Sequence, residues 1–529
     1  MGVQYRLPLL YSNNAAHHYN APCIDMPNAR TTTGKVYLVG AGPGDPGLIT
    51  LRGVECLRRA DVVLYDYLVN PRILEHVRTG AESVCLGRHG HTPVLPQSEI
   101  NERLVREARA GKTVVRLKAG DPAIFAHLAE EIEALAAAEI AVEIVPGITA
   151  ALACGSYAGI PLTQRDAASA VALVTGQEHA EKHSPALDYR GLASFPGTLV
   201  FYMGVTSALH WTRALMDGGK PAGTPASIVR RCSWPDQVTV RTTLERVAVE
   251  IAQRQLRPPV LVVVGEVAAL QTGANWFTHR PLFDVRVMVT RPLMHAEALH
   301  ERLRELGADV LVQPAIEIMA PDDWGPLDRA LARLAEFDWL VFSSANGVCY
   351  LLDRLYQRYG DLRRLGSLKL AAIGPGTAEA LAGYKLRPDV VPDEFRAEAL
   401  AEALAGGAAG RRFLLARASR GREVLAEQLC AAGGEVEQVV VYRSRDVTAP
   451  DPEIATALAA GRIDWVTVTS SAIARSLAAM FGDQLRRARL ASISPVTSGT
   501  LRELGFEPAV EATEFTMVGI VEAIVRGLD

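Results

Sequence analysis

The stretch Lys35-Val-Tyr-Leu-Val-Gly-Ala-Gly-Pro-Gly-Asp-Pro-Gly-Leu-Ile-Thr50 decides the fold of the first part of the chain. Its apolar run from Val36 to Val39 is typical of a buried strand. The run passes directly into a glycine-rich loop, whose backbone can adopt positive φ and approach a ligand closely. We therefore expect the first strand of an α/β sheet, with a candidate ligand-binding loop at its carboxyl end.

This loop fits neither of the common phosphate-binding motifs. No Gly-Lys pair followed by Ser or Thr closes it, as a P-loop would require. When a dinucleotide-binding G-x-G-x-x-G motif is counted from Gly40, Asp45 occupies the third glycine position, where its charge would repel a pyrophosphate. A ligand that is neutral or cationic near the backbone fits better, and a plain strand-to-helix turn remains the alternative.

The composition is that of a globular protein with several domains. The 529 residues suggest about three to four domains. A net charge of −4 gives no indication of a nucleic-acid or membrane partner. The seven cysteines form no C-x-x-C pair, which argues against a disulfide framework and a zinc site and favours the reducing cytoplasm. No metal site and no membrane span are predicted.

Alternating strand-like and helix-like runs predict an α/β architecture along the chain. The polar residues 1–34 are expected to form a disordered or loosely ordered tail. Residues 35–270 form the first large part, with a junction near Pro146 that separates about 35–145 from 146–270. Residues 271–283 break the alternation and are predicted to be a linker, and a new strand begins the part at 284–529.

The last part contains an internal duplication. Residues 291–310 align without gaps on residues 417–436, an offset of 126. Asp338-Trp339 recurs as Asp464-Trp465 at the same offset, whereas a later pair of matching segments is 120 residues apart. Two similar α/β lobes are predicted, and a cleft between their strand ends would be the default binding site.

Several further strand ends follow the first loop in order, and each alone has a plain alternative as a turn, a helix cap or a solvated loop. They are Ala60-Asp-Val-Val-Leu-Tyr-Asp66, Gly87-Arg-His-Gly-His91, Ala119-Gly-Asp-Pro122, Val145-Pro-Gly-Ile-Thr-Ala150, Ala158-Gly-Ile-Pro-Leu-Thr163, Tyr202-Met-Gly204 and Val264-Gly-Glu-Val267. Together the loops and strand ends resemble the tetrapyrrole methylase family, and within it the uroporphyrinogen-III C-methyltransferases, over about residues 35–270.

That resemblance implies S-adenosylmethionine as the methyl donor, bound between two α/β subdomains, and a homodimer formed by this part. The proton acceptor would be Asp66, while Arg88 occupies the position of a proton-donating lysine although a guanidinium stays protonated. The carboxylates of a porphyrinogen would need cations, for which Arg88, His89, His91, Arg116 and Lys118 are candidates. The implied donor-binding residues are Gly42, Pro43, Gly44, Asp45, Ala119, Gly120, Asp121, Ile124, Thr149, Ala150, Met203 and Cys232.

Several positions depart from the family pattern by adding bulk. Ala119 and Cys232 stand where the family has glycine, and residues 126–129 replace a glycine-rich run. Reduced or altered methylase activity is therefore kept open.

The duplicated part resembles uroporphyrinogen-III synthase over about residues 284–529. The matching segments are Val289-Thr-Arg-Pro292, Phe342-Ser-Ser-Ala-Asn-Gly-Val348, Ile373-Gly-Pro-Gly-Thr-Ala378, Phe395-Arg-Ala-Glu398, Val441-Tyr-Arg443 and Pro495-Val-Thr497. The resemblance implies two flavodoxin-like lobes, lobe one at about 284–317 plus 446–529 and lobe two at about 318–445, and a cofactor-free cyclisation of hydroxymethylbilane.

Hydroxyls and amides at strand ends of this part would bind substrate carboxylates. The candidates are Thr290, Arg291, Ser343, Ser344, Asn346, Thr377, Thr497 and Thr516. Tyr442 matches a tyrosine that would assist the leaving hydroxyl, and a half-buried strand tyrosine is its alternative.

The product of a synthase of this kind is the substrate of a uroporphyrinogen-III methylase. We therefore expect a bifunctional enzyme that makes precorrin-2, on the branch toward sirohaem and cobalamin. Two alternatives remain open: an active synthase fused to a methylase of altered substrate, or to a degenerate methylase domain that acts as a ligand-binding sensor or scaffold.

Overall fold

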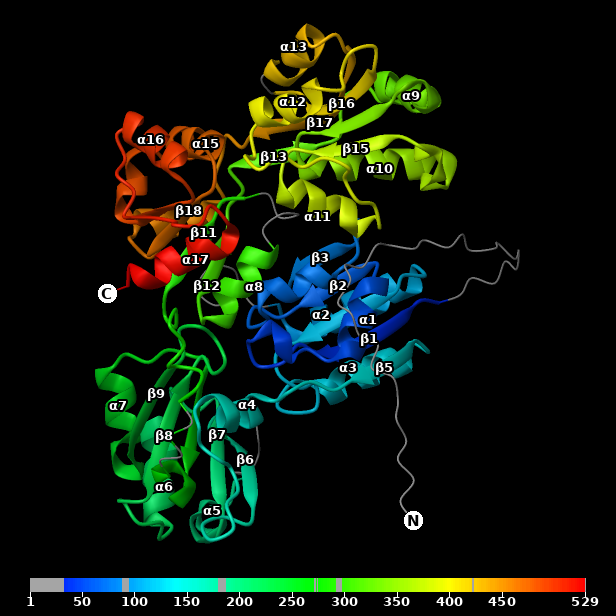
Figure 1. The fold of residues 1–529 in the computed structure, drawn as a ribbon. Helices are drawn as coiled ribbons and strands as arrows, with labels where there is room; N and C mark the ends of the chain where they lie inside the picture. Colours follow the sequence, from blue (N-terminus) through cyan, green and yellow to red (C-terminus); the bar gives the residue numbers. More distant parts are fainter. Residues whose placement is uncertain are drawn as a thin grey trace, which may run out of the picture. The chain divides into compact units, whose positions relative to one another are not determined.

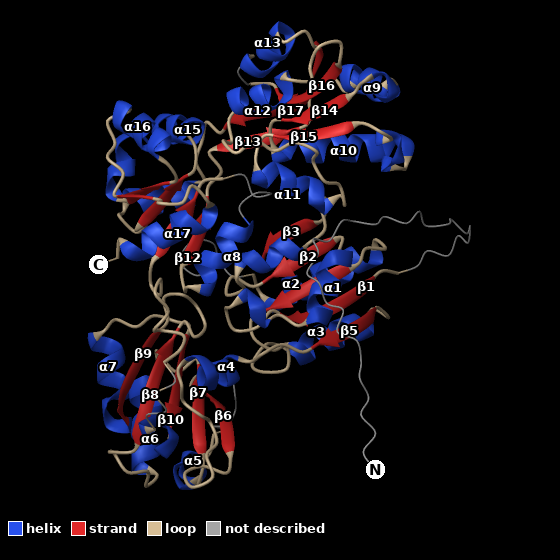
Figure 2. Cartoon of the chain, viewed as in Figure 1, coloured by secondary structure: helices blue, strands red, loops and turns tan. Residues whose placement is uncertain are grey.

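A computed structural model describes residues 33–87, 95–178, 187–270, 273, 275–291, 297–420 and 423–528. The chain divides into two compact units, Met1–Ala153 and Cys154–Asp529. Within the described residues the strands form four five-stranded sheets with helices packed on them, which confirms the predicted α/β class (Figures 1 and 2). The tail predicted for residues 1–34 lies almost wholly outside the described residues. Among the helices of the described part, none combines the length and apolar character needed to cross a membrane.

The sheet of the first unit is parallel, and its apolar strands are buried on both faces. Along β1, Val36 and Leu38 pack in one core while Tyr37 and Val39 pack in the other. Helix α1 (Leu51–Arg59) covers one face, and α2 (Gln97–Arg109) and α3 (Leu128–Ala137) cover the other. In the order β3-β2-β4-β1-β5, the strands are Glu82–Cys85, Val62–Tyr65, Val114–Lys118, Lys35–Gly40 and Ala141–Val145.

The second unit begins within α4 (Ala150–Tyr157) and first builds a mixed sheet. Its order is β6-β7-β10-β8-β9, with strands Val171–Thr175, Thr198–Tyr202, Val260–Val264, Pro225–Arg230 and Val238–Thr243. Helices α5 (Tyr189–Ser194), α6 (Ala208–Asp217) and α7 (Val247–Gln253) pack into one core with this sheet, where Trp211 stacks on Phe201 at 4.1 Å.

The described part of segment 271–283, expected to be a linker, is packed against α4. The Phe277 ring lies 4.6 Å from that of Tyr157, and Trp276 Nε1 donates to Ser156 O at 3.0 Å. The Arg280 guanidinium lies over the Phe277 ring, 4.1 Å from its centre. These contacts fix the chain direction before the next sheet begins.

The remaining two sheets define lobe one and lobe two. Lobe one has the order β12-β11-β18-β19-β20, with strands Asp309–Val312, Arg286–Val289, Trp465–Val468, Arg489–Ser492 and Val510–Glu511. Its strands pair in parallel, and numbered within the lobe they follow the flavodoxin-like order 2-1-3-4-5. Helices α8 (Glu297–Glu305) and α17 (Met517–Arg526) cover one face; α14 (Pro452–Ala459), α15 (Ser471–Phe481) and α16 (Pro495–Glu503) cover the other.

Lobe two shares four parallel strands of this arrangement and has an antiparallel edge strand, β13, beside β17 in place of a counterpart of β20. Its order is β13-β17-β16-β14-β15, with strands Ile316–Met319, Glu435–Asp446, Arg412–Ala418, Trp339–Phe342 and Lys369–Ala372. Helices α9 (Gly325–Ala332), α10 (Ala345–Tyr359) and α11 (Pro375–Gly383) pack on one face. Helices α12 (Ala397–Ala405) and α13 (Val424–Ala431) pack on the other (Figure 1).

The sequence duplication maps strand by strand onto these two sheets. The run β12-β11-β18-β19 in lobe one corresponds to β17-β16-β14-β15 in lobe two. Val287 pairs with Trp465 in the first sheet, and their equivalents at the 126-residue offset, Phe413 and Trp339, pair in the second. Lobe one is interrupted after β12, and the chain builds lobe two before it returns with β18. The two lobes therefore share one sheet arrangement with different chain connections.

Candidate active sites

The carboxyl ends of β1, β4 and β5 meet at three glycines in the first unit. A Cβ on Gly40 would lie 2.6 Å from Gly147 Cα, and a Cβ on Gly147 only 2.2 Å from Gly120 O. Two hydrogen bonds join the turns after β1 and β4. Gly42 N donates to Gly120 O at 3.2 Å, and Gly120 N donates to Gly42 O at 2.7 Å. A Cβ on Gly120 would meet no atom closer than 3.8 Å, so this turn is not crowded by the neighbouring chain. The close contacts explain why glycine is needed here.

Polar side chains hold these turns in shape. Asp45 accepts a hydrogen bond from a main-chain N–H of its own loop at 2.8 Å. Asp121 accepts from Gly147 N at 2.9 Å and so ties the turn after β4 to the turn after β5. The buried Asn70, which sequence reasoning did not single out, donates to Gly44 O at 2.8 Å. Asp45 and Asp121 were both predicted to contact the methyl donor. In the structure, both carboxylates accept hydrogen bonds from the backbone.

Asp66 lies at the end of β2 and is oriented by the neighbouring strand β4. Arg116 Nη2 donates to Asp66 Oδ1 at 2.5 Å. The Asp66 side chain is 31% exposed, and among the described residues its Oδ2 has no hydrogen-bond partner. A carboxylate that is fixed through one oxygen and open at the other is suited to accept a proton from a bound substrate.

Arg116 and Lys118 have a different environment from the one expected of substrate-binding cations. They are only 3% and 2% exposed, and both pair with the fully buried Glu131 of α3. Arg116 Nε lies 3.0 Å and Lys118 Nζ 2.6 Å from Glu131 Oε1. Burial, and then the charge of Arg116, lowers the pKa of Lys118. Their charges are thus committed to Glu131 and Asp66 instead of being presented to a substrate, because an unpaired buried charge would be very costly.

The pattern of cations on β4 in the sequence indicates that a buried acid must face this strand. Two cations at alternate positions of a strand share one face, and a buried strand needs a buried counter-charge there. The acidic first turn of α3 supplies it. The other cation candidates Arg88, His89 and His91 lie outside the described residues.

The remaining donor-binding candidates of the first unit, namely Pro43, Ala119, Ile124, Thr149 and Ala150, lie in or directly after the turns that follow β1, β4 and β5. Met203 and Cys232 belong to the second unit.

Unusual backbone conformations surround these two second-unit residues. Met203, half-exposed after β7, has φ 52°, and Arg231 and Ser233 on either side of Cys232 have φ 49° and 65°. Left-handed residues other than glycine concentrate at functional sites. The buried Cys232 thiol hydrogen-bonds the Cys154 thiol of α4, and this bond, followed by burial, raises the pKa of Cys232. The expected glycine has thus been replaced by one member of a buried thiol pair.

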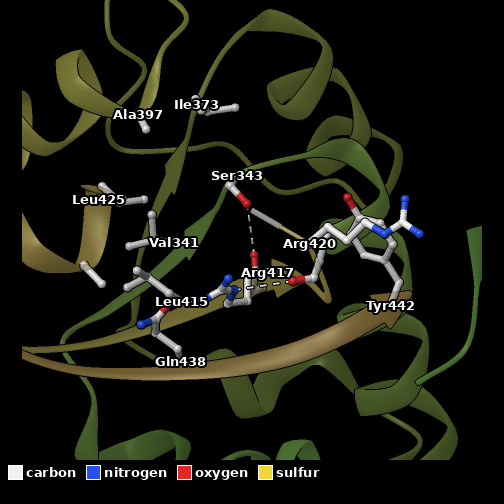
Figure 3. Close-up of a pocket in the computed structure, with 13 residues that line it drawn as sticks. Val341, Ser343, Ile373, Ala397, Leu415, Arg417, Arg420, Leu425, Gln438 and Tyr442 are labelled. Carbon is white, nitrogen blue, oxygen red and sulfur yellow. Dashed lines mark hydrogen bonds between the residues drawn. The ribbon is translucent and has the colours of Figure 1, made fainter. Parts of the chain in front are cut away.

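A cavity of about 230 Å³ lies at the carboxyl ends of β14, β16 and β17 in lobe two (Figure 3). Because the strand order reverses between β14 and β16, this is the position where open α/β sheets bind ligands. Figure 3 shows Leu425 and Val341 on one side and Arg420 with Tyr442 on the other. The cavity is lined by Val341, Ser343, Ile373, Ala397, Leu415, Ala416, Arg417, Ala418, Arg420, Leu425, Ala426, Gln438 and Tyr442.

Tyr442 and Ser344 are brought together beside this cavity. The Tyr442 hydroxyl lies 3.1 Å from Ser344 Oγ, which also accepts from Gly347 N and so caps α10. Ser343 is exposed and its hydroxyl donates to Ala416 O at 3.4 Å. Asn346 lies partly buried in the first turn of α10.

The predicted threonines of the two lobes are mostly engaged in the fold. Thr290 is fully buried and its hydroxyl donates to Thr467 O at 2.6 Å, so it is not presented to a substrate as expected. Thr377 and Thr497 are buried in the first turns of α11 and α16. Thr516 is exposed but caps α17 by accepting from Gly519 N at 3.0 Å.

Arg291 and Arg417 are equivalent residues of the two lobes with different partners. Arg417 pairs with Glu423 and donates to Gln438 Oε1 at 2.7 Å. Arg291 has Nη1 3.1 Å from Met517 Sδ, and no carboxylate among the described residues pairs with it. Burial lowers the pKa of Arg291. A partly buried guanidinium without an acid is suited to bind an anionic ligand.

Comparison with known proteins identifies both parts of the chain. Residues 35–248 match the family of Tetrapyrrole (Corrin/Porphyrin) Methylases, and residues 297–522 match the family of Uroporphyrinogen-III synthase HemD. The porphyrin biosynthesis protein HemD of Ruminiclostridium josui is 33% identical over 455 residues, which are 85% of this chain and 89% of that protein. The uroporphyrinogen-III C-methyltransferase of Bacillus subtilis is 38% identical over 339 residues, 64% of this chain and 69% of the relative.

Among solved structures, the Thermus thermophilus uroporphyrin-III C-methyl transferase in complex with S-adenosyl homocysteine is 40% identical. The match covers 45% of this chain and 99% of that one, with a TM-score of 0.39. Both resemblances are confirmed by the two family matches and by the two relatives, most of whose length is covered by the match to this chain. The chain therefore belongs to two enzyme families of tetrapyrrole biosynthesis, as a fusion of a tetrapyrrole methylase with a uroporphyrinogen-III synthase.

Proposed function

We propose that the chain cyclises hydroxymethylbilane to uroporphyrinogen III and methylates this product twice to give precorrin-2. Residues 35–270 would carry the methylase and residues 284–529 the synthase. The observation that carries the proposal is Asp66, a fixed and partly exposed carboxylate in the same parallel sheet as the three joined glycine turns. Family membership supplies the class of substrate.

The first-unit turns fit S-adenosylmethionine. The turn at Gly120 is not crowded by neighbouring atoms. The loop also lacks the lysine of a P-loop, and Asp45 occupies the third glycine position of a dinucleotide-binding motif, so the loop does not suit a phosphate. When bound, the donor supplies a methyl group made electrophilic by its sulfonium charge. The backbone around Gly42 and Gly120 would hold it, while Met203 and Cys232 of the second unit stay predicted contacts.

Asp66 performs the proton chemistry in this proposal. A pyrrole ring that gains a methyl group at a substituted carbon becomes cationic, and the macrocycle must lose a proton at another position to restore neutrality. The open Oδ2 of Asp66 would accept that proton. Arg116 keeps the carboxylate in place through Oδ1. Glu131 contacts both Arg116 and Lys118 and so remains their carboxylate partner when Asp66 becomes neutral.

The synthase site is proposed at the strand ends of the two lobes. Tyr442, held next to Ser344, would donate a hydrogen bond to the departing hydroxyl of hydroxymethylbilane. Arg291 would bind one of its carboxylates. The lobes would mainly hold the linear chain in the conformation that allows the last ring to invert before closure.

The full chain with hydroxymethylbilane and S-adenosylmethionine provides the test, read by absorbance and mass without oxygen. We expect uroporphyrinogen III followed by a dimethylated product, and Asp66→Asn should stop at uroporphyrinogen III while it still binds the donor. Cyclised but unmethylated product from the wild-type chain, despite measurable donor binding, would contradict the proposal and favour the sensor alternative. Dimerisation through the methylase part stays a prediction for sedimentation analysis.

A further inference from the structure

Each lobe presents one exposed phenylalanine at an equivalent position. Phe395 of lobe two is 63% exposed and Phe515 of lobe one is 62% exposed. They are 120 residues apart, the same offset that relates β15 to β19. Leaving such a ring in water forgoes about 1.5–3 kcal/mol of burial free energy. That both lobes retain the exposure points to a ligand that covers the rings.

Both rings are held by the same tight turn. Arg396 N donates to Glu394 O at 2.8 Å, and Thr516 N donates to Glu514 O at 2.7 Å. A hydrogen bond over three residues defines a γ-turn, and in each lobe phenylalanine is its central residue. Helices α12 and α17 begin directly after these turns. The rings therefore project from fixed backbone.

Phe395 is further positioned by a glycine. A Cβ on Gly374, the residue before α11, would lie 3.1 Å from Phe395 Cβ and 3.2 Å from its Cγ. The lack of a side chain at Gly374 lets Phe395 lie against the start of α11. The ring thus lies at the carboxyl edge of the lobe-two sheet.

Equivalent arginines lie near the chain that follows the two phenylalanines, although their partners differ. Ala397, two residues after Phe395, lines the lobe-two cavity together with Arg417. Met517, two residues after Phe515, is the residue that contacts Arg291. Ala397 and Met517 are equivalent, as are Arg291 and Arg417. Each lobe therefore repeats one unit, an exposed phenylalanine on a γ-turn that leads into a helix whose first residue lines the cavity in lobe two and contacts Arg291 in lobe one.

We propose that Phe395 and Phe515 each stack on a pyrrole ring of the linear tetrapyrrole, with Arg291 of lobe one binding an acidic substituent of the substrate. This inference rests on the proposed synthase function. The repeated unit suits a ligand that is itself a repeat of flat apolar rings with carboxylate substituents. Two fixed rings would hold two pyrroles in place while the last ring inverts.

The test compares Phe395→Ala, Phe515→Ala and their leucine counterparts in the full chain. The matched control is Tyr356→Ala, an aromatic residue of lobe two that is 51% exposed. Tyr356 lies near the end of α10, which starts at the carboxyl edge of the sheet and runs back to the opposite edge. We expect each alanine variant to raise KM for hydroxymethylbilane about five- to tenfold and the control to leave it unchanged.

Analysis of the product isomers adds a second measurement, which would not change if the two phenylalanines had only a structural role. Loss of ring stacking should raise the share of the uninverted product, whereas amide exchange of α12 and α17 should stay as in the wild type. The leucine variants should recover less than half of the lost affinity, because they restore apolar area without an aromatic face.

Two results would overturn the inference while leaving the proposed function intact. One is an active wild-type chain whose phenylalanine variants behave like Tyr356→Ala. The other is unchanged KM together with a lower sedimentation coefficient in the phenylalanine variants, which would make the two rings an interface between copies of this chain. A wild-type chain without synthase activity would instead contradict the proposed function itself.

Discussion

Glu131 is the buried acid that contacts both Arg116 and Lys118, so its removal should be far more damaging than that of its neighbour. In Glu131→Gln, Arg116 and Lys118 lose the acid that both contact within 3.0 Å. We expect the first unit to lose about 3–5 kcal/mol of unfolding free energy. Because all six tryptophans lie beyond residue 153, amide exchange of peptides from β4 and α3 is the suitable measurement.

The matched control for that variant is Glu130→Gln. Glu130 is largely exposed and pairs with His127 at 3.1 Å, an interaction that contributes little to stability. Equal protection of β4 in both variants would show that the buried charges find other partners, and the role given to Glu131 would be wrong.

Asp328 should make the stability of lobe two depend on pH. The bidentate Arg354 guanidinium, at 2.8 and 2.7 Å, holds the pKa of Asp328 below its ordinary value, with help from Arg358. A lowered carboxyl pKa stabilises the fold above the pKa of the unfolded chain, and this contribution is lost as pH falls through the folded pKa. Amide exchange of α9 and α10 should therefore accelerate below about pH 4.

Asp328→Asn supplies the comparison for this pH dependence. The variant should be less stable by about 1 kcal/mol at neutral pH and should show a flatter acid profile in α9 and α10. A variant profile that falls as steeply as the wild type would assign the acid sensitivity to other carboxylates.

Single residues were the hardest to predict from sequence. Asp66 could be expected at a strand end, but the roles of Arg116, Lys118 and Thr290 depended on neighbours far away in sequence. Glu131 lies 15 residues from Arg116, and Thr467 lies 177 residues from Thr290. The sequence looks the same whether a cation or hydroxyl at the end of a strand faces a ligand or a buried partner. Only the packing in the folded structure shows which of these two roles the side chain has.

At the scale of elements, the turn after β5 should tolerate no side chain. In Gly147→Ala, the new Cβ would collide with Gly120 O at 2.2 Å and with Gly40 Cα at 2.8 Å. Both neighbours are backbone, so the turns after β1 and β4 must move apart. We expect at least a tenfold loss of S-adenosylmethionine affinity by calorimetry, while synthase activity is retained.

Gly223→Ala is the control for this turn, because a Cβ there meets no atom within 4 Å. Donor binding in that variant should equal the wild type. If Gly147→Ala also bound the donor normally, the three glycine turns would not form the donor site.

The strands and their repetition could be predicted from the sequence. A strand that is buried on both faces consists of a continuous apolar run, such as Val36 to Val39. The 126-residue offset even predicted which strands would be equivalent, since aligned residues occupy the same sheet position in both lobes. The γ-turns at Phe395 and Phe515 could not be predicted in this way. Three-residue turns have no strong sequence pattern, and exposure of an aromatic ring is a property of the folded chain.

At the scale of the whole chain, the equivalence of the lobes persists although their connections differ. Lobe two is built from one continuous segment, β13 to β17, whereas lobe one is completed only after lobe two, when β18 to β20 join β11 and β12. Sheet position, not chain order, therefore determines which residues reach the carboxyl edge. A ligand with repeated rings can use both edges in the same way.

The two activities should be separable and should recombine in solution. Each proposed reactive group is positioned by elements of its own domain: Asp66 by β4 of the first unit, and Tyr442 by the start of α10 in lobe two. We therefore expect Asp66→Asn to release uroporphyrinogen III, and Tyr442→Phe to methylate added uroporphyrinogen III while cyclising hydroxymethylbilane at least tenfold more slowly. An equimolar mixture of the two variants should convert hydroxymethylbilane to the dimethylated product, because the intermediate can diffuse between chains. Failure of the mixture, with both variants active in their own half-reactions, would mean that the intermediate passes within one chain.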